Sequence, residues 1–224
     1  MADGTLYIGN RRYSSWSLRG WLAVKLAGLD VDVRLIPFVR PAPTPGIAAI
    51  SPNGLVPYLE HSSARVWESL AVCEYCAEIS PSLWPADRAA RAWARSIASE
   101  MHAGFRGLRQ NMWMNLGDDF AARTAGKGRK PEALADIARI ERIWSDTREK
   151  FGAGGPFLFD AAMGVADAMY APVVARFLTW QPELSAGTQD YCDAVRAHPL
   201  VDEWYRDAAA ETADMMQEEY EVQP

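Results

Sequence analysis

The strand signals in this 224-residue chain stop near residue 87, and that division constrains its fold more than any other feature. Before the division, short apolar runs typical of strands alternate with segments of helical spacing, and after it only helical spacing is found. The proline-containing run SPSLWPAD marks the change. We therefore expect an α/β domain at 1–80, a linker at 81–87, an all-helical domain at 88–213 and an acidic tail at 214–224.

The α/β part contains four strand-like runs and two helices. LYIG, VDVRLIPF, VPYLE and RVWE are predicted strands, and leucines with helical spacing over 18–29 predict the first helix. The proline-rich connection PAPTPG leads into one expected helical turn over 47–50, and Ser69 begins the second helix. The order is β-α-β, a connection, then β-β-α, which predicts parallel pairing in the first half and an antiparallel pair in the second.

The second part of the chain reads as helices throughout. A continuous apolar stripe predicts one helix over 88–112, and Pro131 stands at the first position of another, which the run GAGG ends. Three further helices are expected, one beginning at Gly164–Asp167 and two at 188–197 and 199–213. The terminal run QEEYEVQP is acidic, and we expect it to fray.

Charge and composition exclude several classes of function. A formal net charge of −6 is unfavourable for a general nucleic-acid-binding protein, and the longest apolar runs are too short to span a membrane. The N-terminus lacks the basic start and apolar core of a signal peptide. Three cysteines do not form a disulfide framework, so we expect a cytoplasmic protein.

Cys73 and Cys76 form a CxxC pair inside the second predicted helix, where two interpretations compete. A redox-active pair belongs at a helix N-terminus, where the helix dipole lowers the thiol pKa, and a zinc site needs further cysteine or histidine ligands nearby. Neither condition is met here. We therefore expect both cysteines to pack in the core and predict no metal site.

Three short motifs are candidates for a ligand site. Val56-Pro57 begins the third strand, where a cis peptide would turn backbone groups toward an extended ligand, and a trans proline in a turn is the alternative. Glu68 and Ser69 stand at a helix N-terminus, where free N–H groups bind a carboxylate and the glutamate can accept from an ammonium. The alternative is that Ser69 only caps the helix.

The stretch RYSSWSLRG places hydroxyl groups at the start of the first helix. Ser14 could simply cap that helix. Its hydroxyl and the helix dipole could also act together on a bound thiol, whose pKa such surroundings lower toward neutrality. The thiolate is the useful nucleophile, so Ser14 would stabilise it by donating a hydrogen bond.

Taken together, these motifs resemble the glutathione transferases. The resemblance rests on YSSWSLR, SPNGLVPYLE, ESLAVCEY and FLFDAAMGVADAMYAPVV, and it covers nearly the whole chain. It implies a thioredoxin-like N-terminal domain, a helical C-terminal domain, a cytoplasmic homodimer and glutathione as co-substrate. By this resemblance Ser14 and Ser15 would lie at the glutathione sulfur, and Val56, Pro57, Glu68 and Ser69 would bind the tripeptide. In the last motif, Asp167 has the capping role of the third helical residue, and Gly164 stands where Ser or Thr is common.

The opening motif is most similar to that of the zeta-like group, with two departures. Trp16 replaces the cysteine associated with maleylacetoacetate isomerisation, and Leu55 stands where many relatives have Lys or Gln. The resemblance thus implies a transferase acting on a small hydrophobic electrophile. A glutathione-dependent isomerase of the zeta type and a non-catalytic protein-binding module are the alternatives.

The predicted helix over 88–112 carries further candidates. His102 has a usual pKa near the working range and could donate a proton, while a solvated or dimer-facing surface is the alternative. By the resemblance, Arg106 falls near a glutamine position close to glutathione, and Gln110 lies one turn beyond. We assign Arg95 and Arg109 to the solvated or dimer-facing surface.

Overall fold

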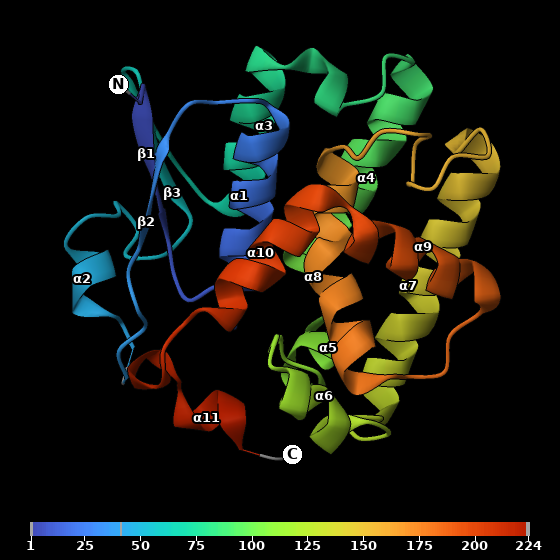
Figure 1. Ribbon diagram of the computed structural model, residues 1–224. Helices are drawn as coiled ribbons and strands as arrows, with labels where there is room; N and C mark the ends of the chain where they lie inside the picture. Colours follow the sequence, from blue (N-terminus) through green and yellow to red (C-terminus); the bar gives the residue numbers. More distant parts are fainter. Residues whose placement is uncertain (1, 41, 223–224) are drawn as a thin grey trace.

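The computed structural model describes residues 2–40 and 42–222, and its N-terminal part is built on a four-stranded sheet (Figure 1). The strands are β1 (Gly4–Ile8), β2 (Asp32–Leu35), β3 (Tyr58–His61) and β4 (Ala64–Trp67), in the order β2-β1-β3-β4. β1 pairs with β2 in parallel, and β3 pairs antiparallel with both β1 and β4. The predicted parallel pair in the first half and the predicted antiparallel pair in the second are confirmed.

Three helices accompany the sheet. α1 (Ser15–Leu26) and α3 (Ser69–Ile79) lie side by side against it, and the short α2 (Pro45–Ala48) lies away from them (Figure 1). α1 also contacts the helices of the C-terminal part, which explains why nearly all of its residues are buried. The buried positions of α1 are mostly apolar, but they also include Ser15, Ser17 and Arg19.

The rest of the described chain is helical. After a short 3₁₀ turn (Pro81–Leu83), the α-helices are α4 (Arg88–Ala103), α5 (Arg106–Asn111), α6 (Asp118–Thr124), α7 (Pro131–Phe151), α8 (Val165–Trp180), α9 (Ala186–Ala197), α10 (Pro199–Ala209) and α11 (Glu218–Glu221), with a second 3₁₀ turn at Ala213–Met215. The central helix, α8, contacts α1, α4, α6 and α9. The fold class is therefore the predicted one, an α/β domain of thioredoxin type followed by a helical bundle.

α8 is buried almost completely, and its N-terminus is held by one carboxylate. Asp167 accepts hydrogen bonds from the backbone N–H groups of Gly164 (2.9 Å) and Leu158 (3.0 Å) and from the Tyr191 hydroxyl (2.9 Å). The expected capping role of Asp167 is confirmed. Over the part of the chain that the structure describes, no helix has both the length and the apolar character needed to cross a membrane.

The single helix expected over 88–112 is wrong. α4 ends at Ala103, and Phe105 takes a left-handed conformation with φ of 59°, so α5 begins in a new direction. Both halves of the apolar stripe are nevertheless buried, because α5 packs closely on α7. Gly107 allows that approach, since a Cβ there would lie 2.5 Å from the carbonyl of Glu132. The short helix α6 was not expected at all.

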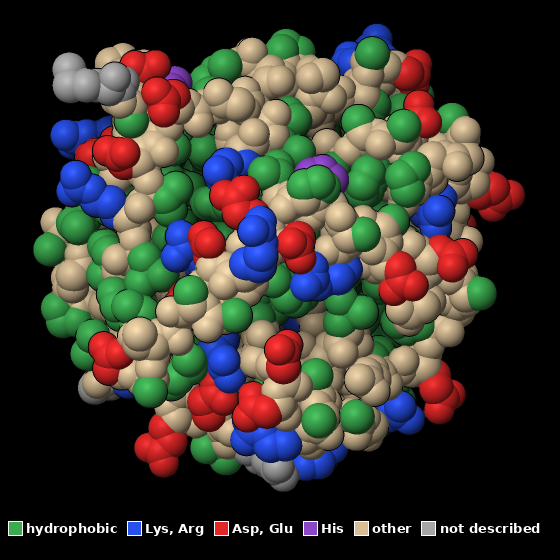
Figure 2. Space-filling view, viewed as in Figure 1, with side chains coloured by type: hydrophobic (Ala, Val, Ile, Leu, Met, Phe, Trp, Pro, Cys, Tyr) green, Lys and Arg blue, Asp and Glu red, His purple; other side chains and the backbone are tan. Residues whose placement is uncertain are grey.

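The frayed tail is also a wrong expectation for the residues that the structure describes. Residues 213–222 fold back from α10 toward α5 and α6, where α11 lies (Figure 1), and Glu221 is held by several polar contacts. Residues 223–224 lie outside the described part. On the face drawn in Figure 2, acidic and basic side chains are interspersed and do not form a patch of one sign.

Candidate functional site

A cavity of about 320 Å³ opens beside the N-terminus of α1, and it brings together three motifs that are far apart in the sequence. Ser14 and Trp16 come from the start of α1, Val56 and Pro57 from the turn before β3, and Glu68 from the start of α3. Its remaining lining residues are Phe38, Arg40, Ala42, Pro43, Thr44, Ile47, Asn53, Gly54, Leu55 and Tyr220.

Ser14 is the N-cap of α1 and is buried. Its hydroxyl accepts a hydrogen bond from the Ser17 backbone N–H (3.2 Å) and donates one to the Ser17 hydroxyl (2.8 Å), which also accepts from the Gly9 N–H (3.0 Å). The capping interpretation is therefore correct for Ser14, and it leaves a second role open. If Ser17 turned its own proton toward Ser14, the Ser14 proton would be free to face the cavity.

Ser15 points away from the cavity. Its hydroxyl accepts a hydrogen bond from Arg176 on α8 (3.4 Å), and Ser15 is not among the cavity-lining residues. The two adjacent serines thus face different neighbours, as successive helical positions must.

The Val56-Pro57 peptide is cis, which confirms the cis form over the trans alternative. Pro57 lies directly against α1, where a Cβ on Gly20 would approach the proline ring to 2.8 Å. Beside it, Leu55 lines the cavity with 57% of its surface exposed. An apolar side chain therefore stands at the cavity rim, where many relatives would present a polar one.

Glu68 and Ser69 lie at the N-terminus of α3, as expected. The Glu68 carboxylate accepts a hydrogen bond from the Asn53 side-chain amide (3.2 Å), and its other oxygen is 3.8 Å from Nε2 of His102. Ser69 is buried, and its hydroxyl oxygen has no hydrogen-bond partner in the described structure. An unpartnered hydroxyl beside a helix N-terminus and a cavity-facing carboxylate can receive a ligand that carries both signs of charge.

The candidates expected on one helix are separated by the break between α4 and α5. His102 stays near the cavity, with its ring in edge contact with Trp16 (5.4 Å between centroids). Arg106 and Gln110 lie on α5, are exposed, and do not line the cavity. Arg95 pairs with Glu74 on the surface, whereas Arg109 is not on the solvated surface, because its guanidinium lies 4.6 Å from the centre of the Trp16 ring.

The cavity includes residues that the sequence did not indicate. Phe38 and Arg40 come from the loop after β2, and Tyr220 comes from the tail. Phe38 belongs to the predicted strand VDVRLIPF, but β2 ends at Leu35. Arg40 donates a hydrogen bond to the Tyr220 hydroxyl (2.5 Å) and pairs with Glu219 (2.6 Å). Nothing in the local pattern of the tail distinguishes Tyr220 from a solvated residue.

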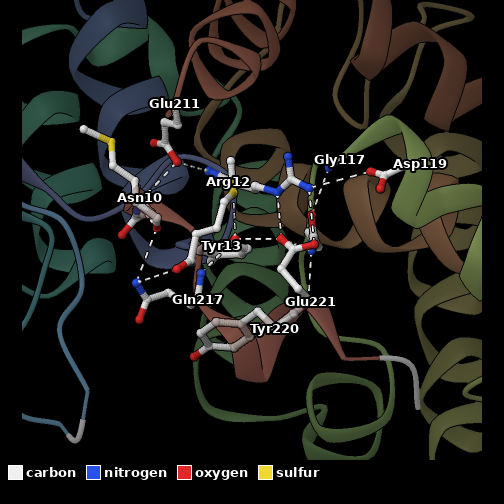
Figure 3. Close-up of polar contacts among 12 residues, drawn as sticks. Asn10, Arg12, Tyr13, Gly117, Asp119, Glu211, Gln217, Tyr220 and Glu221 are labelled. Atoms are coloured by element: carbon white, nitrogen blue, oxygen red, sulfur yellow. Dashed lines mark hydrogen bonds and ion pairs between the residues drawn. The ribbon is translucent and has the colours of Figure 1, made fainter. Parts of the chain in front are cut away.

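Glu221 anchors the tail next to the cavity (Figure 3). Its carboxylate accepts hydrogen bonds from the Tyr13 hydroxyl (2.6 Å), Arg12 Nε (2.9 Å) and the Asn115 side-chain amide (3.0 Å). Burial, followed by the hydrogen bond to Glu221, raises the pKa of Tyr13. The Tyr13 hydroxyl is thus committed to the tail and does not face a ligand.

Cys73 and Cys76 are buried within α3, which confirms core packing. Burial raises the pKa of both thiols, that of Cys76 to about 12. Neither thiol is therefore ionised near neutral pH, and a redox role would require a thiolate.

Both parts of the chain are similar to known proteins. The family model for the glutathione S-transferase N-terminal domain matches residues 13–79, and the model for the C-terminal domain matches residues 123–207. Among solved structures, the chain is similar to a glutathione transferase homologue from Burkholderia gl BGR1 with bound glutathione, with 21% identity and a TM-score of 0.68 over 93% of this chain and 99% of that one. No curated protein matches the chain.

Two further solved structures show the same fold. One is a theta class glutathione S-transferase from Xanthomonas axonopodis pv. citri with glutathione bound, at 20% identity and a TM-score of 0.65, covering 95% of this chain and 99% of that one. The other is a maleylacetoacetate isomerase from Anaeromyxobacter dehalogenans 2CP-1, at 21% identity and a TM-score of 0.65, covering 97% and 98%. The two matched domains belong to one family, follow each other in the family's order and together span more than half of the chain. This protein therefore belongs to the glutathione S-transferase superfamily.

Proposed function

We propose that this protein is a glutathione-dependent transferase that joins the glutathione sulfur to a small electrophile. The observation that carries the proposal is the convergence of Ser14, the cis Val56-Pro57 peptide and Glu68 on one cavity. Two of the similar solved structures contain glutathione, which supports the choice of thiol. We also propose a cytoplasmic homodimer, as in the family that the sequence resembles.

The proposed roles follow from the chemistry of each group. The backbone of Val56 would pair with the cysteinyl part of glutathione, and Glu68 and Ser69 would hold the γ-glutamyl ammonium and carboxylate. Ser14 would donate its hydroxyl proton to the sulfur, while Ser17 replaces it by donating to Ser14. This hydrogen bond favours the charged form and lowers the pKa of the bound thiol.

The reaction then needs no further protein nucleophile. The thiol proton leaves to solvent, the sulfur lone pair forms the new carbon–sulfur bond, and the leaving group departs with the electron pair of the broken bond. Trp16, Phe38 and Tyr220 supply apolar walls where an electrophile can lie next to the sulfur.

Calorimetry with glutathione and with S-methylglutathione tests this proposal. We expect Glu68→Gln to weaken binding of both ligands about tenfold, because it removes a charge-assisted hydrogen bond. We expect Ser14→Ala to leave S-methylglutathione binding unchanged and to raise the pKa of bound glutathione by roughly 1 to 2 pH units. Ser63→Ala and Glu78→Gln, at exposed positions outside the cavity, are the matched controls.

Two results would contradict the proposal. Folded wild-type protein that does not bind millimolar-range glutathione cannot be a glutathione transferase. Equal thiol pKa values in wild type and Ser14→Ala, measured by thiolate absorbance on the complex, would leave Ser14 as a helix cap and nothing more.

Isomerisation through a glutathione adduct is the second candidate. The SSxSxR pattern at residues 14–19 and the similarity to a maleylacetoacetate isomerase favour it. Trp16 at the cysteine position of that pattern opposes it. Activity assays with a cis enone acid would separate the two candidates, because only isomerisation regenerates free glutathione. A protein-binding module without catalysis would show neither activity.

A further inference from the structure

Three arginines lie close together, and two of them contact Trp16. Arg19 comes from α1, Arg109 from α5 and Arg176 from α8. The guanidinium of Arg19 lies 4.7 Å and that of Arg109 lies 4.6 Å from the centre of the Trp16 ring. We call Arg19, Arg109 and Arg176 the arginine cluster.

Two members of the arginine cluster are buried without complete hydrogen bonding. Arg19 is fully buried, and its Nε donates to the Met169 carbonyl (2.8 Å), but Nη1 and Nη2 have no partner in the described structure. Arg176 is 5% exposed; Nη1 donates to the Pro172 carbonyl (2.9 Å) and Nη2 to Ser15, but Nε has no partner. Buried donors are normally paired, so these atoms require an explanation.

The cluster also lacks a balancing negative charge. Within residues 2–40 and 42–222, no carboxylate forms an ion pair with any of the three arginines; Asp136 acts on Arg109 only from a distance. Burial and repulsion from Arg109 lower the pKa of Arg176 to about 9, so the side chain stays charged at neutral pH. Uncompensated buried charge is strongly unfavourable, whereas an anion would relieve it.

Trp16 connects the cluster to the cavity. It is the residue that both lines the cavity and contacts Arg19 and Arg109, and its side chain is only partly buried. The backbone carbonyls that hold the arginines are neutral, so they position the guanidinium groups without cancelling their charge. None of the three arginines lines the cavity, so their N–H donors would reach it only if the Trp16 indole rotates.

We propose that the arginine cluster binds a carboxylate group of the acceptor substrate, with the Trp16 indole turned aside. Guanidinium groups suit this ligand, because their planar N–H donors match the two oxygens of a carboxylate. The statement that the acceptor substrate carries this carboxylate rests on the proposed function. The anion site itself does not depend on it.

Binding of malonate at constant ionic strength tests the anion site. We expect malonate to raise the melting temperature of wild-type protein with a saturable concentration dependence. Arg109→Gln and Arg176→Met should each weaken malonate binding about tenfold, because each removes charge-assisted donors. Arg95→Gln is the matched control, since Arg95 lies over the Trp84 ring at 5.4 Å outside the cluster.

The same titration with chloride and with inorganic phosphate separates the possible sources of the anion. Saturable stabilisation by malonate that both cluster variants lose would support the proposal. Stabilisation by chloride or phosphate but not by malonate would overturn it, and so would the absence of any anion-specific effect. If Arg176→Met does not fold, Arg109→Gln decides the outcome, because Arg109 is only partly buried.

A kinetic comparison tests the link to the acceptor. A chloronitrobenzoate and the matching chloronitrobenzamide undergo the same reaction, in which the thiolate sulfur bonds to the ring carbon and chloride leaves with the bonding pair. We expect kcat/KM to favour the benzoate about tenfold in wild type, and this preference should vanish in Arg109→Gln and persist in Arg95→Gln. Equal rates for the two acceptors would refute the acceptor role while the transferase proposal stands. Malonate binding without conjugation of either acceptor would refute the transferase proposal and leave the anion site.

Discussion

The charge state of His102 depends on the groups that surround its ring. Its Nε2 is 3.8 Å from Glu68, its ring touches Trp16, and its Nδ1 is buried without a partner in the described structure. Burial is the main cause that lowers the pKa of His102; Arg19 and Arg109 lower it further, while Glu68 raises it. A neutral imidazole at pH 7 is a better proton acceptor than donor, which limits the role that the sequence suggested for it.

The lowered pKa of His102 predicts a loss of stability in mild acid. The unfolded protein binds this proton near pH 6.5 but the folded protein only at lower pH, so the free energy of unfolding falls as the pH drops below about 6.5. We expect His102→Gln to reduce this fall in the free energy of unfolding. The reduction is at most about 1.4 kcal/mol for each pH unit that separates the pKa of His102 in the unfolded protein from its pKa in the folded protein. Urea unfolding of wild type and variant at about pH 7.5 and about pH 5.5 measures this change in stability. Burial also lowers the pKa of His198, but His198 is present in both proteins and so contributes equally to them. An identical pH dependence in the two proteins would contradict the prediction.

At the scale of elements, the tail segment 213–222 is held by side chains and not by apolar burial, since α11 and the preceding 3₁₀ turn contain no buried residue. Glu221 supplies more of the polar contacts than any other residue of this segment (Figure 3). Burial acts to raise the pKa of Glu221, but hydrogen bonds from Tyr13, Arg12 and Asn115 outweigh it and the pKa is lowered. The docked tail is therefore stable above the usual carboxyl pKa and is released as the pH falls through the lowered value.

We expect Glu221→Gln to loosen the tail. Losing charge-assisted hydrogen bonds worth about 1.5 kcal/mol should speed amide hydrogen exchange over 213–222 about tenfold, with little change in α1 or α8. Glu218→Gln is the control, because Glu218 is exposed and its side chain forms no ion pair in the described structure. Unchanged exchange in Glu221→Gln would show that other contacts, such as that between Arg40 and Tyr220, hold the tail.

At the scale of the whole molecule, the two parts of the chain share one core. Trp21 of α1 packs on Trp204 of α10 with ring centroids 5.3 Å apart, and both rings are buried. Trp204 donates a hydrogen bond to the Arg11 carbonyl (3.1 Å), and Arg19 donates to Met169. The C-terminal helices therefore cover the side of α1 that faces away from the sheet.

This arrangement predicts that residues 1–80 do not fold stably alone. Removing the C-terminal helices would expose Trp21 and leave the Arg19 guanidinium without its carbonyl partner, and each loss costs on the order of 2 kcal/mol or more. Amide NMR spectra of the isolated fragment should show the narrow dispersion of an unfolded chain, whereas the full chain should unfold in one cooperative transition. A well-dispersed fragment spectrum would show that the N-terminal part is autonomous.

Features that depend on neighbouring residues could be predicted from the sequence. The order of strands and helices along the chain, the start of α3 at Ser69, the cap at Ser14 and the capping role of Asp167 all follow from patterns of a few residues. The cis bond before Pro57 is one of two forms that the sequence allows. Hydrophobic periodicity and capping chemistry act over one or two turns, so they are visible in any short window. These local features also place most of the candidate site, because the relevant side chains stand at helix starts and strand ends.

Contacts between distant segments were decided only by the tertiary structure. Tyr220 and Arg40 meet at the cavity from positions 180 residues apart, and Arg109 reaches Trp16 because the chain turns at Phe105. A solvated tail and a continuous helix are equally compatible with the local patterns there. Local sequence patterns are enough to predict the fold class and the positions of the motifs that line the cavity. Only the packed structure decided that three arginines share one buried space, because charge repulsion and burial depend on distances that no short window of sequence contains.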